Sequence, residues 1–245
     1  MENSISVVLP VIIFIVAILY SSIGHGGASG YIAAMALFGI LPVILKPTAL
    51  CLNLTVSLVA AICFTRAGYF SWSLFWPFAL TSVTTSFIGG YINLPLHVYK
   101  ILLGCVLFIS AYRLLIQPGT DRTAIRRPST AVSLVVGSVI GLLSGLIGVG
   151  GGIFLSPLLV LMRWADAKEA SAVSAFFILV NSASGLLGYL YRHQAVPGIS
   201  SSLLVAAVAG GIIGSYAGCY KLPRPVIVRT LSLVLFTAGS KMILV

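Results

Sequence analysis

The stretch Ile23-Gly24-His25-Gly26-Gly27 returns in the second half of the chain as Ile147-Gly148-Val149-Gly150-Gly151. Both copies lie in long apolar stretches without Asp, Glu, Lys or Arg, where glycines are not needed for surface turns. Glycine interruptions at corresponding places in two halves of a membrane protein are typical of a substrate site. The duplication therefore predicts both an internal repeat and the place where function resides.

The composition is that of a membrane protein. Hydrophobic residues make up 59% of the 245 positions and charged residues 7%, and the mean hydropathy is +1.13. Soluble domains carry roughly 25% charged residues, so this chain has too few charges to cover a globular surface. The charge-free stretch 3–45 is longer than the roughly 20 residues that one spanning helix needs. We therefore predict an all-α, polytopic membrane protein.

The net charge of +10 does not indicate a nucleic-acid partner. In a membrane protein, Lys and Arg at helix ends set the orientation and contact lipid headgroups. The four cysteines lack CxxC spacing and lie in apolar runs, so we interpret them as packing residues. No metal or cofactor is expected.

Charges, prolines and glycines divide the chain into two similar halves. The first membrane repeat is predicted over 1–116 and the second over 130–245, joined by a hydrophilic cytoplasmic linker at 117–129. Four long helices are expected in each repeat, with one short apolar helix after the glycine cluster. The long helices are predicted over 5–23, 47–65, 72–92, 97–116, 130–147, 169–190, 200–219 and 225–244, and the short ones over 28–40 and 153–163.

The number of crossings decides the orientation of the repeats. If the short helices cross, each half has five crossings and the second half is inserted upside down; otherwise the repeats are parallel. With the linker in the cytoplasm, five crossings place ten of the 14 Lys and Arg residues on the cytoplasmic side, whereas four crossings divide them evenly. Positive residues favour the cytoplasmic side. We therefore predict inverted repeats with both termini outside.

Each glycine cluster precedes a helix too short to span the bilayer. A helix of 11–13 residues covers about 17–20 Å, less than the roughly 30 Å hydrocarbon core, so the cluster turns the chain in or near the membrane. The first N–H groups of such a helix lack intrahelical partners and, with the helix dipole, attract anions. Inverted repeats would bring two such ends, near Ala28 and Gly152, face to face. The alternative is that the glycines only allow close helix packing.

The candidate substrate-binding residues lie in the clusters and on the helices that follow the short pieces. His25, expected inside the membrane, either donates to an anion or carries a proton, or is satisfied by backbone carbonyls. Neutral Asn and Ser side chains donate to an oxyanion without the cost of burying a charge, and interhelical hydrogen bonding is the alternative. The full set is Gly24, His25, Gly26, Gly27, Ser29, Asn53, Ser57, Gly148, Gly150, Gly151, Gly152, Ser174 and Asn181.

Three motifs resemble the TauE/SafE family of sulfite exporters and related permeases. They are Gly-His-Gly-Gly-Ala-Ser-Gly at 24–30, Gly-Val-Gly-Gly-Gly-Ile-Phe-Leu-Ser-Pro-Leu-Leu at 148–159 and Lys-Glu-Ala-Ser-Ala-Val-Ser-Ala at 168–175. The resemblance covers essentially the whole chain as two repeats, although the first copy has no proline that matches Pro157. It implies a permease for sulfite, an organosulfonate or another small sulfur-containing anion.

We therefore expect a secondary transporter of the cell membrane, most simply a bacterial inner membrane, that holds its anion between the two glycine breaks. An anion channel or an uncoupled facilitator is the first alternative. An intramembrane enzyme is the second, but it needs an acid/base or nucleophile set. The four acidic residues are all expected in termini or loops, so no carboxylate serves such a set: Glu2, Asp121, Asp166 and Glu169.

Overall fold

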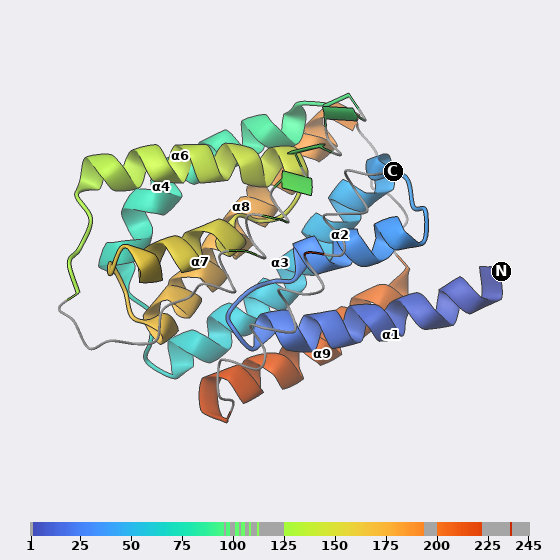
Figure 1. Ribbon diagram of the computed structural model, residues 1–245, viewed down its shortest axis with the longest axis horizontal. Coiled ribbons are helices and arrows are strands. Elements are labelled where there is room, and N and C mark those ends of the chain that lie inside the picture. The colour runs from blue at the N-terminus through green and yellow to red at the C-terminus, as the bar shows by residue number, and fades with distance from the viewer. Residues whose placement is uncertain are drawn as a thin grey trace.

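The computed structural model describes residues 2–95, 97–98, 101–102, 104–105, 108, 112, 125–193, 200–221 and 236. These residues form helices and connecting turns, with no strand in the described ranges (Figure 1). The helices are α1 (Glu2–Ser21), α2 (Ala28–Leu37), α3 (Pro42–Arg66), α4 (Trp72–Tyr91), α6 (Thr130–Ile147), α7 (Gly152–Leu161), α8 (Ala167–His193) and α9 (Ser201–Tyr220). The predicted helices 97–116 and 225–244 lie largely outside the described residues.

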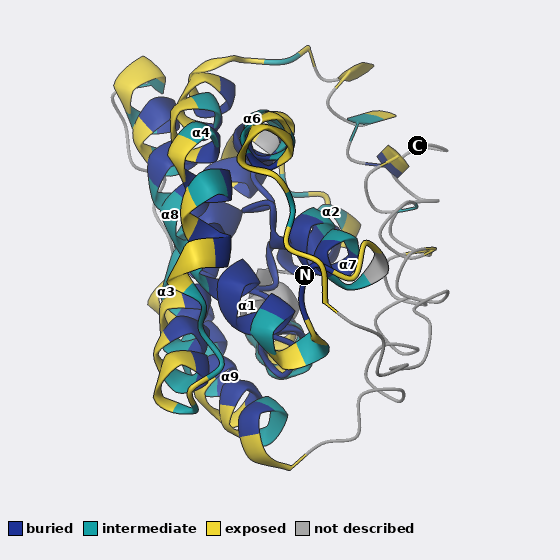
Figure 2. Cartoon of the chain, turned by 90° about the vertical axis from the view of Figure 1, so that its left-hand side faces the viewer, coloured by how far each residue is buried: buried dark blue, intermediate teal, exposed yellow. Residues whose placement is uncertain are grey.

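Four of the described helices, α3, α6, α8 and α9, are long and apolar enough to cross a membrane. Figure 2 shows that exposed residues follow the outer faces of the bundle, and many of them are large and apolar, among them Trp72, Val135, Val205 and Ile212. Apolar side chains on the outside suit a lipid environment. The prediction of an all-α, polytopic membrane protein is confirmed.

Local sequence signals set several helix ends. The Ser129 side chain accepts a hydrogen bond from the Val132 N–H and so caps α6. Asp166 caps α8 in the same way, since its Oδ1 accepts from the N–H groups of Lys168 and Glu169, both at 2.9 Å. These caps satisfy N–H groups that lack intrahelical partners. Asp166 thus precedes α8, while Glu169 lies in its first turn rather than in a loop.

Rows of small residues hold two helix pairs in close parallel contact. Gly137, Gly141 and Gly145 of α6 face the carbonyl oxygens of Phe78, Ser82 and Ser86 of α4, one turn at a time. Gly210, Gly214 and Gly218 of α9 likewise face those of Phe14, Ile18 and Ser22 in and just after α1. A Cβ at any of these glycines would overlap the facing carbonyl, so they serve the close packing typical of membrane helices.

The two middle helices, α3 and α8, run in opposite directions. The Tyr189 hydroxyl donates to the Val43 carbonyl at 3.0 Å, and further along Asn53 bonds to Ser182. Ala60 and Ala61 then meet Ala172 and Ala175. The residue numbers rise on one helix as they fall on the other, which defines an antiparallel pair.

The remaining contacts group the long helices by direction. α3 runs parallel to α9, since Val56 lies against Gly211 and Cys63 against Cys219. α4 runs parallel to α8, since Ser82 lies against Asn181 and Phe87 against Gly188. Together with the pairs above, α1, α3 and α9 point one way and α4, α6 and α8 the other.

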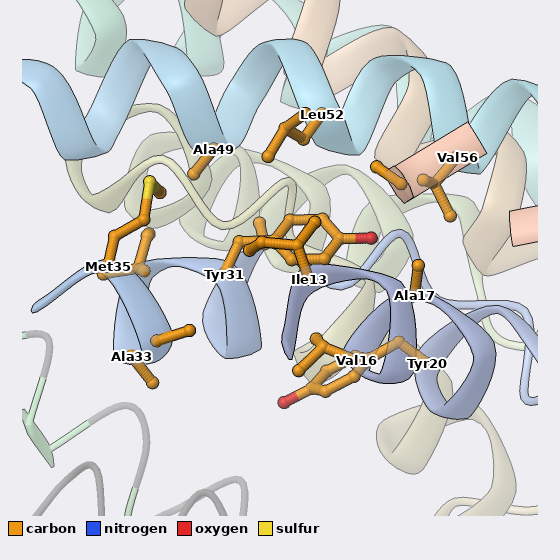
Figure 3. Close-up of a cluster of buried hydrophobic side chains, with 14 of the residues drawn as sticks. Ile13, Val16, Ala17, Tyr20, Tyr31, Ala33, Met35, Ala49, Leu52 and Val56 are labelled. Atoms are coloured by element: carbon orange, nitrogen blue, oxygen red, sulfur yellow. The ribbon is translucent and has the colours of Figure 1, made fainter. Parts of the chain in front are cut away.

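The fourth described helix of each half, α4 or α9, packs into the hydrophobic core of the other half. One core cluster joins α1, α2 and α3 with Leu203 and Ala207 of α9, and a second joins α6, α7 and α8 with Leu74, Phe75 and Phe78 of α4. Figure 3 shows part of the first core, with Tyr31 and Met35 of α2 beneath Leu52 and Ala49 of α3. Each core is thus completed by a helix from the other half of the sequence.

One expectation about α3 was wrong. The helix was predicted to begin at residue 47, which placed Lys46 in a loop, but it begins at Pro42 and contains Lys46 and Pro47. Proline is tolerated at the first position of a helix. Pro47 cannot donate to the carbonyl of Val43, four residues earlier, and the Tyr189 hydroxyl supplies that hydrogen bond instead.

Candidate functional site

Both glycine breaks are built from left-handed backbone. Gly24 and Gly27 have φ of 75° and 95°, and Gly148, Gly150 and Gly151 have φ of 86°, 78° and 79°. Residues other than glycine rarely adopt these angles. The turns end α1 and α6 and start α2 and α7, whose N-caps are Gly27 and Gly151. The repeated sequence therefore encodes a repeated turn.

The two breaks meet around the side chain of Asn53. Its Oδ1 accepts a hydrogen bond of 3.1 Å from the N–H of Ala28, the first residue of α2. Its Nδ2 donates to the Val149 carbonyl at 3.3 Å and to Ser182 Oγ at 2.9 Å. We call this meeting place, formed by residues 24–28, 148–152 and Asn53, the junction.

The junction lies in the middle of the bundle. Asn53 is near the centre of α3 (Pro42–Arg66), about 17–20 Å from either end at 1.5 Å per residue. Ser182 is similarly central in α8. Because these helices are long enough to cross a membrane, the junction lies near the mid-depth of the membrane-spanning bundle.

His25 connects the first break to the start of α7. The side chain is 5% exposed, with Nδ1 3.1 Å from the Ile23 carbonyl and Nε2 3.1 Å from the Gly152 carbonyl. A neutral imidazole has a single N–H and donates to one of these oxygens, whereas the protonated ring donates to both. These contacts agree with the alternative considered for His25 from the sequence, a histidine satisfied by backbone carbonyls.

The glycines at the junction also make room for polar side chains. A Cβ at Gly26 would overlap the Asn53 carboxamide, and one at Gly150 would lie against Asn53 and 2.8 Å from Ser182 Oγ. A Cβ at Gly24 would meet Ser171, and one at Gly148 would lie 3.0 Å from Lys46 Cγ. Close approach and positive φ thus both require glycine here.

The remaining four candidate residues lie outside the junction: Ser29, Ser57, Ser174 and Asn181. Ser174 is fully buried on α8, and its carbonyl lies 3.3 Å from the position of a Cβ at Gly152. Ser29 points away, donating to the Tyr20 hydroxyl of α1 at 2.9 Å, and Ser57 bonds to Leu54 within its own helix. Asn181 of α8 turns its side chain towards α4, because its Nδ2 donates to Ser82 Oγ of α4 as well as to the Phe177 carbonyl of its own helix.

Lys46 is the most informative residue missed by sequence reasoning. It is 7% exposed, and its Nζ donates to the carbonyls of Gly89 and Gly90 at 3.2 Å and of Ile92 at 3.4 Å. It thereby caps the C-terminal end of α4, where carbonyls lack partners and the helix dipole is negative. Its position beside an apolar run was the available signal, since ionisable residues inside membranes are rare and functional.

Buried polar atoms around the junction have no partner among the described residues. They include the hydroxyls of Tyr31, Ser144 and Ser174. Tyr31 Oη lies 2.7 Å from the position of a Cβ at Gly27, and Ser144 Cβ lies 3.4 Å from that of a Cβ at Gly151. Unpaired buried polar groups are uncommon in native proteins and are often satisfied by water or a ligand.

The fold and the junction define a polytopic helical membrane protein with a paired helix break at its centre. The family model for sulfite exporter TauE/SafE matches residues 9–242, so the chain belongs to this family. The resemblance seen in the sequence is confirmed, and the family is one of membrane transporters. No solved structure gives a significant match.

Three relatives carry transporter names. The chain is 37% identical over 239 residues to probable membrane transporter protein y4hK of Sinorhizobium fredii, covering 96% of this chain and 97% of that protein. A probable membrane transporter protein of Methanocaldococcus jannaschii is 27% identical over 204 residues, covering 78% and 75%. YunE of Bacillus subtilis, also a probable membrane transporter protein, is 28% identical over 113 residues, covering 46% and 41%.

Proposed function

We propose that this protein is a secondary transporter for a small sulfur-containing oxyanion, such as sulfite or an organosulfonate, which binds at the junction. One observation carries the proposal: two short helices begin at the same depth of a membrane bundle, at left-handed glycines, with their N-terminal ends joined through Asn53. Helix N-termini bind anions through free N–H groups and the helix dipole.

The charges near the junction favour an anion over a cation. His25 and Lys46 are the buried basic side chains of the described residues, and both contact the breaks. Asp166 is exposed and Glu169 is partly exposed, so neither of these carboxylates is buried. A site with basic groups, N–H groups and hydroxyls but no acid complements negative charge.

Helix direction supports inverted repeats. The helices α1, α3 and α4 of the first half correspond in order to α6, α8 and α9 of the second. The members of each corresponding pair point in opposite directions. Contacts between α3 and α8 show this directly for that pair. The packing of Gly137 of α6 on α4 and of Gly210 of α9 on α1 fixes the directions of the other helices. In inverted-repeat transporters, substrate sites lie between the repeats, which rock to open alternately on each side. We propose the same cycle here, in the cell membrane.

The test is anion flux into proteoliposomes that contain the full chain, with sulfite, sulfate, thiosulfate and a sulfonate as probes. We expect saturable uptake that accelerates when unlabelled anion is preloaded on the opposite side, as in carrier counterflow. Gly26→Ala and Gly150→Ala should lower flux at least about tenfold, because the added Cβ displaces Asn53.

Gly39→Ala is the matched control. Gly39 has φ of 76°, close to the 78° of Gly150, but a Cβ there would meet nothing within 4 Å. It therefore carries the same backbone strain, about 1 kcal/mol, without touching the junction. Equal flux in all variants would refute the site, and saturation without counterflow would indicate a channel rather than a carrier.

A further inference from the structure

The two helix ends at the junction are not equivalent. Gly24 lies against Ser171 and Gly148 against Lys46, so position 46 of α3 corresponds to position 171 of α8. By that correspondence, the counterpart of Asn53 is Ile178, which contacts Gly150 and Gly152. A polar carboxamide thus faces the start of α2, whereas an apolar side chain faces the start of α7.

The start of α2 already holds an acceptor. Asn53 Oδ1 accepts from the Ala28 N–H, in the place that an oxygen of a bound anion would occupy. The same carboxamide is fixed by its bonds to Val149 and Ser182, so all its polar atoms are used. A substrate would have to displace this side chain to bind at α2.

N–H groups without a partner among the described residues occur at both ends, Ser29 and Gly30 in α2 and Gly152 and Ile153 in α7, but the start of α7 has no side-chain acceptor such as Asn53 Oδ1. Hydrogen bonds among the described residues do not include the N–H groups of Gly152 and Ile153, while those of Phe154 and Leu155 bind the Gly151 carbonyl. Ser144 and Ser174 are fully buried, and their hydroxyls have no partner among these residues. Both serines lie near the start of α7: Ser144 Cβ is 3.4 Å from the position of a Cβ at Gly151, and the Ser174 backbone carbonyl is 3.3 Å from that of a Cβ at Gly152.

We propose that the protein binds a single oxyanion at the N-terminus of α7, held by the Gly152 and Ile153 N–H groups and the Ser144 and Ser174 hydroxyls, while Asn53 closes the N-terminus of α2. This inference rests on the proposed function and assigns its substrate to one of the two breaks. The ligand is a small anion with at least three acceptor oxygens, which neutral donors bind without a second buried charge.

The test compares three substitutions that each remove one buried hydroxyl. Ser144→Ala and Ser174→Ala remove the hydroxyls beside α7, and Tyr31→Phe removes the unpartnered hydroxyl beside Gly27 at the start of α2. Binding of sulfite and of sulfate to the purified full chain in lipid nanodiscs is measured by calorimetry. We expect each serine substitution to raise Kd about tenfold, as loss of a hydrogen bond to a charged group does, and Tyr31→Phe to leave Kd unchanged.

A second measurement separates binding from structure. Because the serine hydroxyls have no partner within the described protein, the ligand-free melting temperature of the serine variants should stay equal to or above that of the unaltered chain. Weakened binding in Tyr31→Phe would overturn the assignment to α7. Unchanged Kd in both serine variants would also overturn it and would indicate a buried water instead. If the unaltered chain binds and transports none of the anions, the proposed function itself fails.

Discussion

The side chains of Asn53 and Ser182 join the two halves of the protein at their centre, with Nδ2 donating to Oγ at 2.9 Å. We expect Ser182→Ala to lower the free energy of unfolding by about 0.6–1.7 kcal/mol, the range of interhelical hydrogen bonds in membranes. Asn53→Ala should cost more, about 2–4 kcal/mol, because it also leaves the Ala28 N–H and the Val149 carbonyl unpaired. Reversible unfolding in mixed micelles, followed by circular dichroism, measures both.

The double variant tests whether the pair interacts. If the bond exists, Ser182→Ala should add little, less than about 0.5 kcal/mol, to a chain that already carries Asn53→Ala. Ser57→Ala is the control, since Ser57 bonds only within its own helix and is equally buried. Fully additive losses would show that Asn53 and Ser182 do not interact.

Lys46 and Lys168 cap the ends of corresponding helices, α4 and α9, and of the two only Lys46 is buried. Lys168 is exposed and donates to the Cys219 carbonyl at the end of α9, as Lys46 does to the end of α4. Lys46→Gln removes the buried positive charge at the C-terminal end of α4, from a side chain whose Cγ lies near Gly148, and keeps N–H donors for the cap. We expect anion flux to fall roughly tenfold, equivalent to about 1.4 kcal/mol.

Lys168→Gln is the comparison for this prediction. Water screens an exposed charge, so flux should change less than about twofold. Melting temperatures of both variants in detergent report whether the caps survive. Equal losses of flux in the two variants would show that the charge of Lys46 has no special role.

Cys63 and Cys219 place their sulfur atoms 2.9 Å apart, at the C-terminal ends of α3 and α9. Copper phenanthroline with oxygen should therefore oxidise this pair, which loses two protons and two electrons as the disulfide forms. Counting free thiols with a maleimide after denaturation should give two of the chain's four cysteines instead of all four. In Cys63→Ser, the same treatment should leave all three remaining thiols free. If the unaltered chain keeps four free thiols after the oxidant is added, the contact between α3 and α9 is contradicted.

Helix bounds were the part of the fold that the sequence predicted best. The helix predicted over 130–147 has those bounds in the structure, because Ser129 and Gly148 mark its ends through side-chain capping and a positive φ. The pair of short helices after the glycines was also recognised, although each is shorter than predicted. Such signals are local, so a single stretch of sequence is enough to read them.

The contents of the junction depend on contacts between distant residues. Both Asn53 and Asn181 were candidates from the sequence, but the contacts at Gly26 and Gly150 make Ile178, and not Asn181, the structural counterpart of Asn53 in the second half. Lys46 lies inside α3 beside Pro47, and the Val43 carbonyl that Pro47 leaves free is satisfied by the distant Tyr189 hydroxyl. No local pattern contains these relationships, because helix packing between the halves creates them.

The orientation of the protein in the membrane can be tested at two glycines. Gly39 follows α2 and Gly68 follows α3, and since α3 connects these turns, they lie at opposite ends of the bundle. A Cβ at either position would meet nothing within 4 Å, so cysteine is accommodated there apart from the cost of positive φ.

With both termini outside, Gly39→Cys should react with a membrane-impermeant maleimide in intact cells, whereas Gly68→Cys should react only after permeabilisation. Each substitution is made in a chain whose own cysteines are replaced by serine. A fluorescent protein fused after Val245 should remain dark, and alkaline phosphatase at the same place should be active. The reverse labelling pattern would place the termini in the cytoplasm and would contradict the orientation inferred from the positive residues.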